Sequence, residues 1–419
     1  MAFASSQMTR SVTRVAGFRD AEFDYQLLRA IGVADYGGST AGECLAAASS
    51  IVDGDTRSWV RVFGALADRV EVWADACLDR RRLVSARDHL LRASTYHRTA
   101  EYYAEDDPVT LEMRGRRSRA CFTRAAELFD PPIEALSIPF DGGLLPAYLV
   151  HPVGPRGAAA EPRGTVVAVG GFDASAEELF FQLGAPGATR GWQVLVFDGP
   201  GHAGCMRDNP GMVFRPDYDA PVAAVIDAVS ARPGGETVVL AGLSQGAYFA
   251  AQAASVDARV TALVLDSPVV DLYRYFEAMI GPEVFRMRRD IRPQDVEGVP
   301  WDLLPAQMVW GIAAVCRRFG VGSLHAWLRR LDAFRLGEAV GRISCPALAL
   351  RGEHEGAEVD RQAAALAAGA SGPVTERVFA MDEGADAHSQ VGNLRLAAQV
   401  IYDWLDDVVA GLTPGDSSS

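Results

Sequence analysis

Short apolar runs alternate with helix-like segments through the middle of the chain, and no other feature of the sequence restricts the fold as strongly. Runs with the length and composition of buried strands occupy residues 165–169, 193–197, 237–241 and 262–266. Helices are expected between them, for example at 176–183 and 219–230. Apolar strands that alternate with helices form a parallel sheet that is covered on both faces. The sequence therefore predicts an α/β fold.

The alternation stops after residue 266 and resumes near the C-terminus. Strands are expected at 347–350 and 374–379, before a final helix at 394–409. Residues 267–344 between them form helix-like segments rich in bulky side chains, among them Tyr273. We interpret this insertion as a helical lid over the sheet, whose aromatic side chains, Tyr273 included, would contact a substrate.

Residues 20–129 have a helical pattern throughout. Trp59, Phe63, Leu66, Val70 and Trp73 recur at spacings of three and four and form one apolar stripe. A hairpin with strands at 133–140 and 144–151 follows. We expect a helical N-terminal packing or dimerisation domain over 1–130. An α/β domain would span 131–412, with its lid at about 267–344, and 413–419 would be a disordered tail.

Charge and composition exclude several classes of function. A net charge of -14 repels a polyanion, so nucleic acid is not expected as a partner. The chain has no lysine, which excludes a lysine Schiff base and a P-loop. The six cysteines are scattered, as in reduced cytosolic proteins, and suggest no zinc site. Without a secretory signal or a membrane span, we expect a cytoplasmic protein that needs no metal or cofactor.

Ser244 lies in the segment Gly242-Leu243-Ser244-Gln245-Gly246, directly after an apolar run and directly before a helix-like segment. Glycines on both sides allow a sharp strand-to-helix turn, which exposes the serine hydroxyl and leaves backbone N–H groups free to bind an oxyanion. The five-residue pattern alone has little specificity. Its context nevertheless makes Ser244 the candidate nucleophile.

A serine hydroxyl needs a base to become a nucleophile, and His388 is the best candidate. It follows the serine, near the C-terminus and just before the last helix, as the order of nucleophile, acid and histidine requires. His202 follows a strand at the ligand-binding edge of the sheet but precedes the serine, which suits a substrate-contacting loop. His354 lies where the acid should be.

The acid of the triad is expected after the strand at 347–350, in the segment Gly352-Glu353-His354-Glu355. Glu355 takes the place where an aspartate is usual, and a glutamate can also orient an imidazole. Glu358 and Asp360 are the alternatives. The sequence leaves the choice among these three carboxylates open, with Glu355 preferred.

An oxyanion hole should combine two backbone N–H groups. One belongs to Gln245, and the other comes from the loop Gly170-Gly171-Phe172-Asp173 after the first parallel strand, where Phe172 is the expected donor. Glycines let this backbone approach a substrate closely. We therefore expect Gly171 and Asp173 to contact the substrate together with His202.

A sheet interrupted by a helical lid is the plan of the α/β-hydrolase fold, and the motifs are similar to a known group within it. The sequence resembles the two-domain α/β-hydrolases that include 2,6-dihydroxypseudooxynicotine hydrolase and the fungal yellowish-green pigment hydrolase that shortens polyketides. The similarity spans most of the chain. The segments that carry it are Arg92 to Glu101, Gly170 to Asp173, Asp198-Gly199-Pro200-Gly201, Gly242 to Gly246, and Gly384-Ala385-Asp386-Ala387-His388.

The resemblance implies hydrolysis of a carbon–carbon bond beside a ketone, with Ser244 adding to the carbonyl and His388 managing the protons. It also implies a homodimer through the N-terminal helices. The leading hypothesis is thus a cofactor-free serine hydrolase of small aromatic or polyketide-like ketones or esters, with the substrate enclosed between the sheet, the lid and the N-terminal helices. The alternatives are a natural-product tailoring lyase or acyltransferase on the same fold, and a non-catalytic ligand-binding protein.

Overall fold

The computed structural model describes residue 8 and residues 10–154, 160–282, 291–296 and 306–411. Within them, eight strands form one sheet in the order β1-β2-β4-β3-β5-β6-β7-β8. The strands are β1 (Glu134–Phe140), β2 (Gly143–Val150), β3 (Thr165–Val169), β4 (Gln193–Phe197), β5 (Val238–Leu243), β6 (Val260–Asp266), β7 (Ala347–Gly352) and β8 (Val374–Phe379). The hairpin β1-β2 is antiparallel, and β2 joins β4 in antiparallel fashion. The strands from β4 to β8 are parallel, so the predicted α/β-hydrolase fold class is confirmed.

Both faces of the sheet are buried, because successive side chains of each strand point to opposite sides. On β3, Val166 and Ala168 belong to one apolar core, while Val167 and Val169 belong to the other. Helices cover both faces: α6 (Ala176–Leu179), η3 (Phe180–Gly184), α7 (Ala185–Ala188) and α17 (Leu394–Val409) pack into the first core, and α9 (Asp219–Ser230), α10 (Gln245–Ala254) and α16 (Ala357–Gly369) pack into the second. This two-faced burial explains the continuous apolar runs from which the sheet was predicted.

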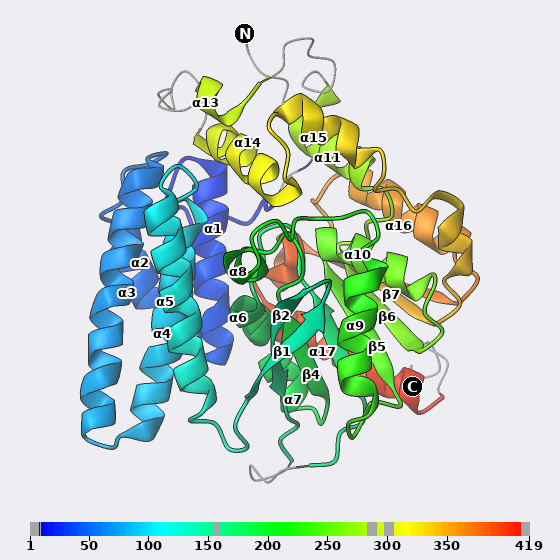
Figure 1. The fold of residues 1–419 in the computed structure, drawn as a ribbon, viewed down its shortest axis with the longest axis horizontal. Coiled ribbons are helices and arrows are strands. Elements are labelled where there is room, and N and C mark those ends of the chain that lie inside the picture. The colour runs from blue at the N-terminus through cyan, green and yellow to red at the C-terminus, as the bar shows by residue number, and fades with distance from the viewer. Residues whose placement is uncertain (1–7, 9, 155–159, 283–290, 297–305, 412–419) are drawn as a thin grey trace.

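The N-terminal region is helical, as predicted. Its helices are α1 (Ala21–Gly32), η1 (Val33–Tyr36), α2 (Ala41–Ala48), α3 (Thr56–Asp79), α4 (Leu83–Tyr102) and α5 (Pro108–Ala126). They stand beside the sheet, on the left of Figure 1. In the predicted stripe, Trp59, Phe63, Leu66 and Val70 are buried. Trp73 is 42% exposed, because at that turn of α3 the neighbouring Ala74 faces the core instead, and the Trp73 ring lies against His89.

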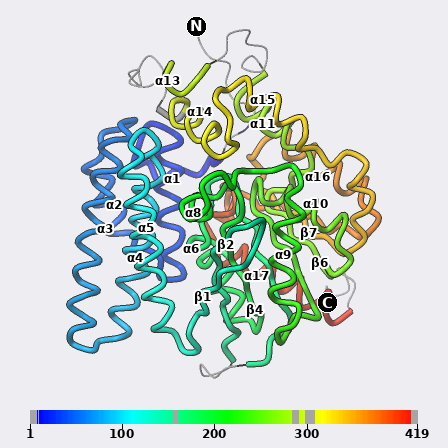
Figure 2. The backbone as a smooth tube through the Cα atoms, in the orientation of Figure 1, coloured from blue at the N-terminus to red at the C-terminus, as the bar shows by residue number. Residues whose placement is uncertain are grey.

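Helices between β6 and β7 lie over the carboxyl edge of the sheet, at the top of Figures 1 and 2. In the described residues they are α11 (Leu272–Ile280), α13 (Pro293–Val296), α14 (Ala306–Phe319), α15 (Leu324–Leu331) and η4 (Gly337–Arg342). We call α11 to α15 the lid. It also contacts the N-terminal helices, since Trp310 Nε1 donates to the carbonyl of Tyr102 at 2.5 Å and Arg317 pairs with Glu105 at 2.7 Å. The lid therefore connects the N-terminal helices with the sheet domain.

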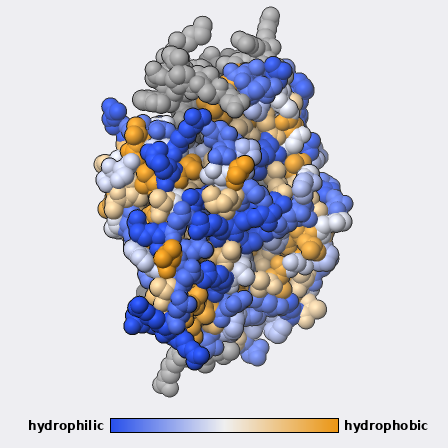
Figure 3. All heavy atoms as spheres, turned by 60° about the vertical axis from the view of Figure 1, so that its left-hand side comes forward, coloured by the Kyte–Doolittle hydropathy of each residue, from blue (hydrophilic) through white to orange (hydrophobic). Residues whose placement is uncertain are grey.

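The outer surface of the N-terminal helices is mixed in character. Figure 3 brings this side forward and shows hydrophobic side chains as separate spots among hydrophilic ones. Val72 and Val109 are among the exposed apolar side chains. No helix in the described part of the chain is both long and apolar enough to cross a membrane. The predicted tail at 413–419 lies outside the described residues.

Candidate active site

Ser244 occupies the turn between β5 and α10. Its backbone has φ 55° and ψ −121°, a conformation that costs a non-glycine residue about 1–3 kcal/mol and that tertiary contacts must maintain. Its N–H donates to the carbonyl of Asp266 at 2.5 Å. A Cβ atom on Gly242 would lie 2.3 Å from the carbonyl oxygen of Gly246, and one on Gly246 would lie 2.1 Å from that of Val169. The two glycines are required because the chain passes itself so closely here.

His388 and Glu355 are joined directly. His388 Nδ1 lies 2.5 Å from Glu355 Oε1, and the carboxylate is 1% exposed. Ser267 Oγ donates to the same oxygen at 2.6 Å, and the backbone N–H of Gly352 donates to Oε2 at 3.1 Å. These donors hold the carboxylate in place, and the carboxylate in turn orients the imidazole. The pair therefore has the geometry of an acid that orients a histidine.

The other two candidate carboxylates point elsewhere. Asp360 pairs with Arg351 at 2.5 Å and its side chain is 53% exposed. Glu358 accepts hydrogen bonds from Arg361 and Gln362, the next turn of its own helix. Of the three carboxylates that the sequence left open, the structure brings only Glu355 to His388. The sequence pattern preferred Glu355, and the backbone path after β7 turns the other two carboxylates away from the histidine.

Ser244 and His388 line the same cavity, although no hydrogen bond joins Ser244 Oγ to His388 Nε2. The polar contact of Ser244 Oγ within the described residues is the hydroxyl of Tyr275, 3.5 Å away. Hydrogen bonds between catalytic groups are often long in unliganded enzymes and shorten when substrate binds. Ser244 and His388 thus line one cavity without direct contact, and Glu355 lies behind the imidazole.

The loop after β3 lies against the nucleophile. A Cβ atom on Gly171 would lie 3.0 Å from the carbonyl oxygen of Leu243 and 3.1 Å from Ser244 Cβ, so this position suits glycine. Gly171, Phe172 and Gln245 all line the cavity. Neither the N–H of Phe172 nor that of Gln245 makes a hydrogen bond within the described residues. Two unengaged N–H groups beside a serine are what an oxyanion hole requires.

His202 differs from the prediction. It is 1% exposed and does not line the cavity, so it cannot be the substrate contact that its loop suggested. Its Nδ1 accepts from the N–H of Gly199 at 3.1 Å, which leaves the proton on Nε2. Nε2 donates to the carbonyls of Gly170 and Gly171 at 3.2 and 2.9 Å. Burial and the nearby Arg318 lower the pKa of His202 to about 4. The neutral ring therefore supports the glycine loop from below.

Tyr273 also differs from the prediction. It lies on α11, as does Tyr275, but two residues of a helix are about 200° apart, so the two rings point to opposite sides. Tyr275 is 2% exposed and lines the cavity. Tyr273 does not, and its ring lies against the guanidinium of Arg335 at 4.0 Å. The lid helix was predicted, but the rotation of its faces depends on how α11 docks on the sheet.

Asp173 lines the cavity as expected, but its carboxylate is engaged. Arg29 donates to both of its oxygens, at 3.1 and 3.3 Å, from helix α1. Burial alone would raise the pKa of Asp173, but Arg29, Arg10 and Arg98 hold it well below its usual range. Asp173 is therefore an ionised carboxylate that ties the loop after β3 to the N-terminal helices.

The cavity has a volume of about 490 Å³, a size typical of small-molecule sites. Its walls come from three parts of the chain. The turn after β5 supplies Ser244 and Gln245, and the lid supplies apolar side chains such as Phe276 and Trp310. The N-terminal segment and α1 supply the third wall, in line with the expectation that the N-terminal helices help to enclose the substrate. Its lining residues are Met8, Arg10, Ser11, Ala21, Glu22, Tyr25 and Arg29.

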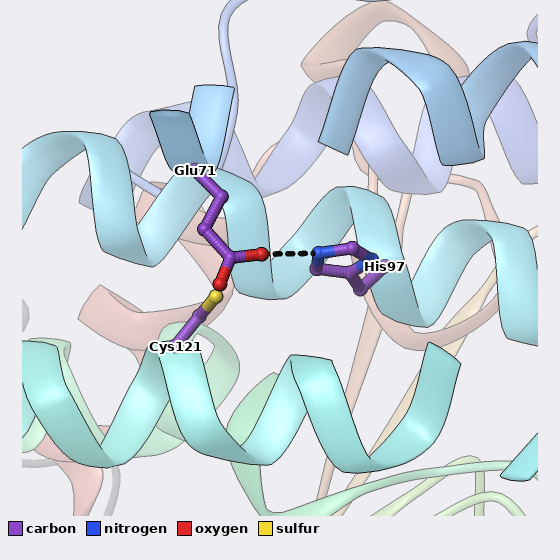
Figure 4. Close-up of side chains that lie close together, drawn as sticks. All are labelled: Glu71, His97 and Cys121. Atoms are coloured by element: carbon purple, nitrogen blue, oxygen red, sulfur yellow. Dashed lines mark hydrogen bonds and ion pairs between the residues drawn. The ribbon is translucent and has the colours of Figure 1, made fainter. Parts of the chain in front are cut away.

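A separate cluster in the N-terminal helices has the residue types of a metal site. Glu71, His97 and Cys121 come from α3, α4 and α5 and lie close together (Figure 4). Arg114 Nη1 donates to His97 Nδ1 at 3.2 Å, so Nε2 carries the proton and donates to Glu71 at 3.0 Å. Arg117 pairs with the same carboxylate at 2.6 Å, and burial raises the pKa of the Cys121 thiol to about 12. Protonated donors and two arginines make this a buried hydrogen-bond network unsuited to a cation.

The fold and this cavity define the class of protein. A mostly parallel sheet, a serine on a sharp strand-to-helix turn and a lid above the carboxyl edge are the features of an α/β-hydrolase. No family model matches the sequence. Hydrolase ORFZ of Pyricularia oryzae is 30% identical over 417 residues, which cover 93% of this chain and 97% of that protein. Alpha/beta hydrolase xenA of Xenoacremonium sinensis is 30% identical over 77% of this chain and 80% of that protein. The chain belongs to the α/β-hydrolase family and is an enzyme of hydrolase type.

Solved structures show the same architecture. The 2,6-dihydroxy-pseudo-oxynicotine hydrolase aligns with a TM-score of 0.69 and 20% identity, covering 91% of this chain and 96% of its own. AbyA5 aligns with a TM-score of 0.60 and 17% identity, over 88% of this chain and 90% of its own. Because these alignments cover nearly the whole chain, the helical N-terminal region and the lid belong to the shared fold. At this level of identity, the similarity concerns the fold.

Proposed function

We propose that this α/β-hydrolase cleaves its substrate with Ser244 as nucleophile, His388 as base and Glu355 as the acid that orients the base. The observation that carries the proposal is the buried bond of 2.5 Å between Glu355 and His388, whose side chain lines the same cavity as Ser244. A histidine held by a carboxylate and a serine on a strained turn form the usual arrangement of an activated serine.

In this mechanism Ser244 Oγ adds to a carbonyl carbon while His388 takes the hydroxyl proton. The backbone N–H groups of Phe172 and Gln245 stabilise the negative charge on the carbonyl oxygen, a contribution of about 2.7–4 kcal/mol for one such donor. The bond to the leaving group then breaks, and water releases the acyl group from Ser244 with the help of His388. No cofactor takes part in these steps.

The proposed substrate is a small aromatic or polyketide-like ketone, cleaved at the carbon–carbon bond next to the carbonyl, or a corresponding ester. The apolar lining by lid residues such as Phe276, Trp310 and Trp327 supports an aromatic or extended apolar substrate. The bond type rests on the resemblance to 2,6-dihydroxypseudooxynicotine hydrolase. Gly171 and Asp173 remain proposed substrate contacts because they line the cavity, and Tyr275 takes the place of Tyr273. His202 is no longer among the proposed contacts.

A fluorophosphonate probe tests the proposal directly. Incubation of the folded protein should add one probe molecule to Ser244, which peptide mass spectrometry locates. The Ser244→Ala variant should remain unlabelled. A folded wild-type protein that hydrolyses a substrate but takes up no probe at Ser244 would rule out the nucleophile.

A tailoring lyase or acyltransferase is the second candidate, because no hydrogen bond links Ser244 to His388. In a lyase, His388 would remove a proton from the substrate directly. The relative from Penicillium oxalicum, 30% identical over 79% of this chain, carries the name hydrolyase poxO. Turnover in ¹⁸O-labelled water separates the candidates. Hydrolysis places the label in the product carboxylate, whereas elimination and acyl transfer do not.

A homodimer through the N-terminal helices is part of the proposal. Exposed apolar side chains on α3 and α5, such as Val72, Trp73 and Val109, support contact between copies. Light scattering after size-exclusion chromatography measures the mass. A monomer at micromolar concentration would contradict this part without affecting the catalytic residues.

A further inference from the structure

Two hydroxyl groups face each other in the cavity. The phenol oxygen of Tyr275 lies 3.5 Å from Ser244 Oγ, at the outer limit of a hydrogen bond. Within the described residues the phenol makes no closer polar contact, although its side chain is buried. Buried tyrosine hydroxyls usually have a good partner. The phenol of Tyr275 is therefore available to form a hydrogen bond with a molecule that binds beside the two hydroxyls.

The position of Tyr275 is well supported. The carboxamide of Gln362, on α16, accepts from the N–H groups of Val270 and Asp271 at 2.7 and 2.9 Å and donates to the carbonyl of Asp271 at 2.9 Å. That carbonyl accepts the N–H of Tyr275 at 3.0 Å. The first turn of α11 is thereby fixed to the sheet domain. A group held by such contacts is placed accurately enough to take part in chemistry.

The phenol is a donor at neutral pH. Burial raises the pKa of Tyr275 to about 12, although the contact with Ser244 acts in the opposite direction. The hydroxyl therefore keeps its proton. His388, which lines the same cavity, uses Nδ1 to bind Glu355 and is needed to receive the proton of Ser244.

A leaving group needs a proton when it departs as a carbanion or an alkoxide. In the tetrahedral intermediate the leaving atom is bonded to the same carbon as Ser244 Oγ. A donor that lies 3.5 Å from Oγ is therefore within reach of a leaving atom on the lid side of the intermediate. Tyr275 is on the lid side of the cavity, and the oxyanion-hole candidates are on the sheet side.

We propose that Tyr275 is a second catalytic hydroxyl, which donates its proton to the leaving group as the bond to the acyl carbon breaks. This inference rests on the proposed function, because it needs Ser244 as nucleophile. The electron pair of the broken bond forms a new bond to the phenol proton. The resulting tyrosinate regains a proton from the His388 imidazolium, directly or through water. The products are the neutral leaving group and acylated Ser244, which water then hydrolyses.

The test varies the leaving group while the attacking group stays the same. Aryl esters of one alkylphosphonic acid, from p-nitrophenyl (a good leaving group) to phenyl (a poor one), phosphonylate an active serine in a single turnover. The labelling rate at Ser244 is measured by mass spectrometry for wild type and for Tyr275→Phe, which removes only the hydroxyl. Tyr273→Phe is the matched control, because it makes the same change on the same helix outside the cavity.

Tyr275→Phe should react with the p-nitrophenyl ester at nearly the wild-type rate and with the phenyl ester about 10²-fold more slowly. Tyr273→Phe should match wild type with both. If Tyr275→Phe lowered the labelling rate equally for all esters, the proposal would be overturned, because a loosened lid slows every ester alike. An unchanged labelling rate with every ester would overturn it too. A wild-type protein that no ester labels would instead refute the proposed function itself.

Discussion

The hydroxyl of Tyr25, on helix α1, donates to the backbone carbonyl of His388 at 3.2 Å. The N–H of His388 donates to the carbonyl of Arg10 at 2.6 Å, so both backbone groups of this residue are held by the N-terminal part of the chain. Thr13 Oγ1 also donates to Asp386 at 2.6 Å, two residues earlier. The N-terminal region therefore supports the loop that carries the imidazole, in addition to forming one wall of the cavity.

Removal of the Tyr25 hydroxyl tests this support. Tyr25→Phe should lower kcat by about tenfold and cost about 1 kcal/mol of stability, because one hydrogen bond to a buried carbonyl is lost. Tyr402→Phe is the control, since the Tyr402 hydroxyl donates to the carbonyl of Leu183 at 2.7 Å, outside the cavity. Steady-state kinetics and thermal unfolding of both variants give the answer. Equal kcat values in the two variants would show that the bond contributes to stability alone.

Replacement of the nucleophile should abolish catalysis without affecting the fold. Ser244→Ala should reduce kcat by about 10³-fold or more, because the covalent step is lost. Ser255→Ala, at the other end of α10, should keep wild-type activity. Activity of the purified variants and their circular dichroism spectra are compared. Residual activity of Ser244→Ala near that of wild type would favour the lyase alternative.

The choice of acid can be checked by neutralising carboxylates one at a time. Glu355→Gln should lower kcat by about 10²–10⁴-fold, because an amide cannot stabilise the imidazolium or hold its tautomer. Asp360→Asn changes an exposed carboxylate on the following helix and should have little effect. The kcat of each variant is measured on the same substrate. A larger loss in Asp360→Asn would mean that the acid has been misassigned.

The buried carboxyl of Asp198 should make stability depend on pH. Burial and the nearby Glu177 raise the pKa of Asp198 from 3.8 to about 7, although Arg119 opposes this. Between these values the folded protein keeps a proton that the unfolded chain has lost. The stabilising contribution of the protonated carboxyl is therefore complete below about pH 4 and is lost as the pH rises towards 7.

Asp198→Asn imitates the protonated carboxyl and should remove this dependence. Relative to the variant, wild type should lose about 2 kcal/mol of unfolding free energy between about pH 5 and about pH 8, as urea denaturation can measure. Asp208→Asn is the control, since this more exposed carboxylate also pairs with Arg119. The idea fails if Asp198→Asn and wild type show parallel stability curves.

The elements that were predicted correctly are those whose signal is local. Each parallel strand is buried on both faces, so its apolar run is continuous and visible in the sequence. The turn at Ser244 was recognisable because the close passage of its backbone demands Gly242 and Gly246. The order of Ser244, Glu355 and His388 along the chain follows from the connectivity of the sheet.

The errors concern properties that depend on how elements dock. Tyr273 and Tyr275 are both tyrosines of α11, and they differ only in the face of the helix on which they lie. His202 lies on the loop after β4, but its two ring nitrogens bind the backbone of Gly199 in that loop and of Gly171 in the loop after β3. The contribution of Arg10 and Tyr25 to the site had no local signal, because they meet His388 across more than 360 residues.

The sequence by itself determined the layered α/β plan, the strand-to-helix turn and the types of residue available for chemistry, because periodicity, glycine positions and composition act over short distances. Only the tertiary structure decided among the three carboxylates left open for His388, which lid tyrosine faces Ser244 and which N-terminal residues line the cavity. These choices depend on the relative placement of packed elements, where a rotation of one helix by two residues exchanges a buried side chain for an exposed one.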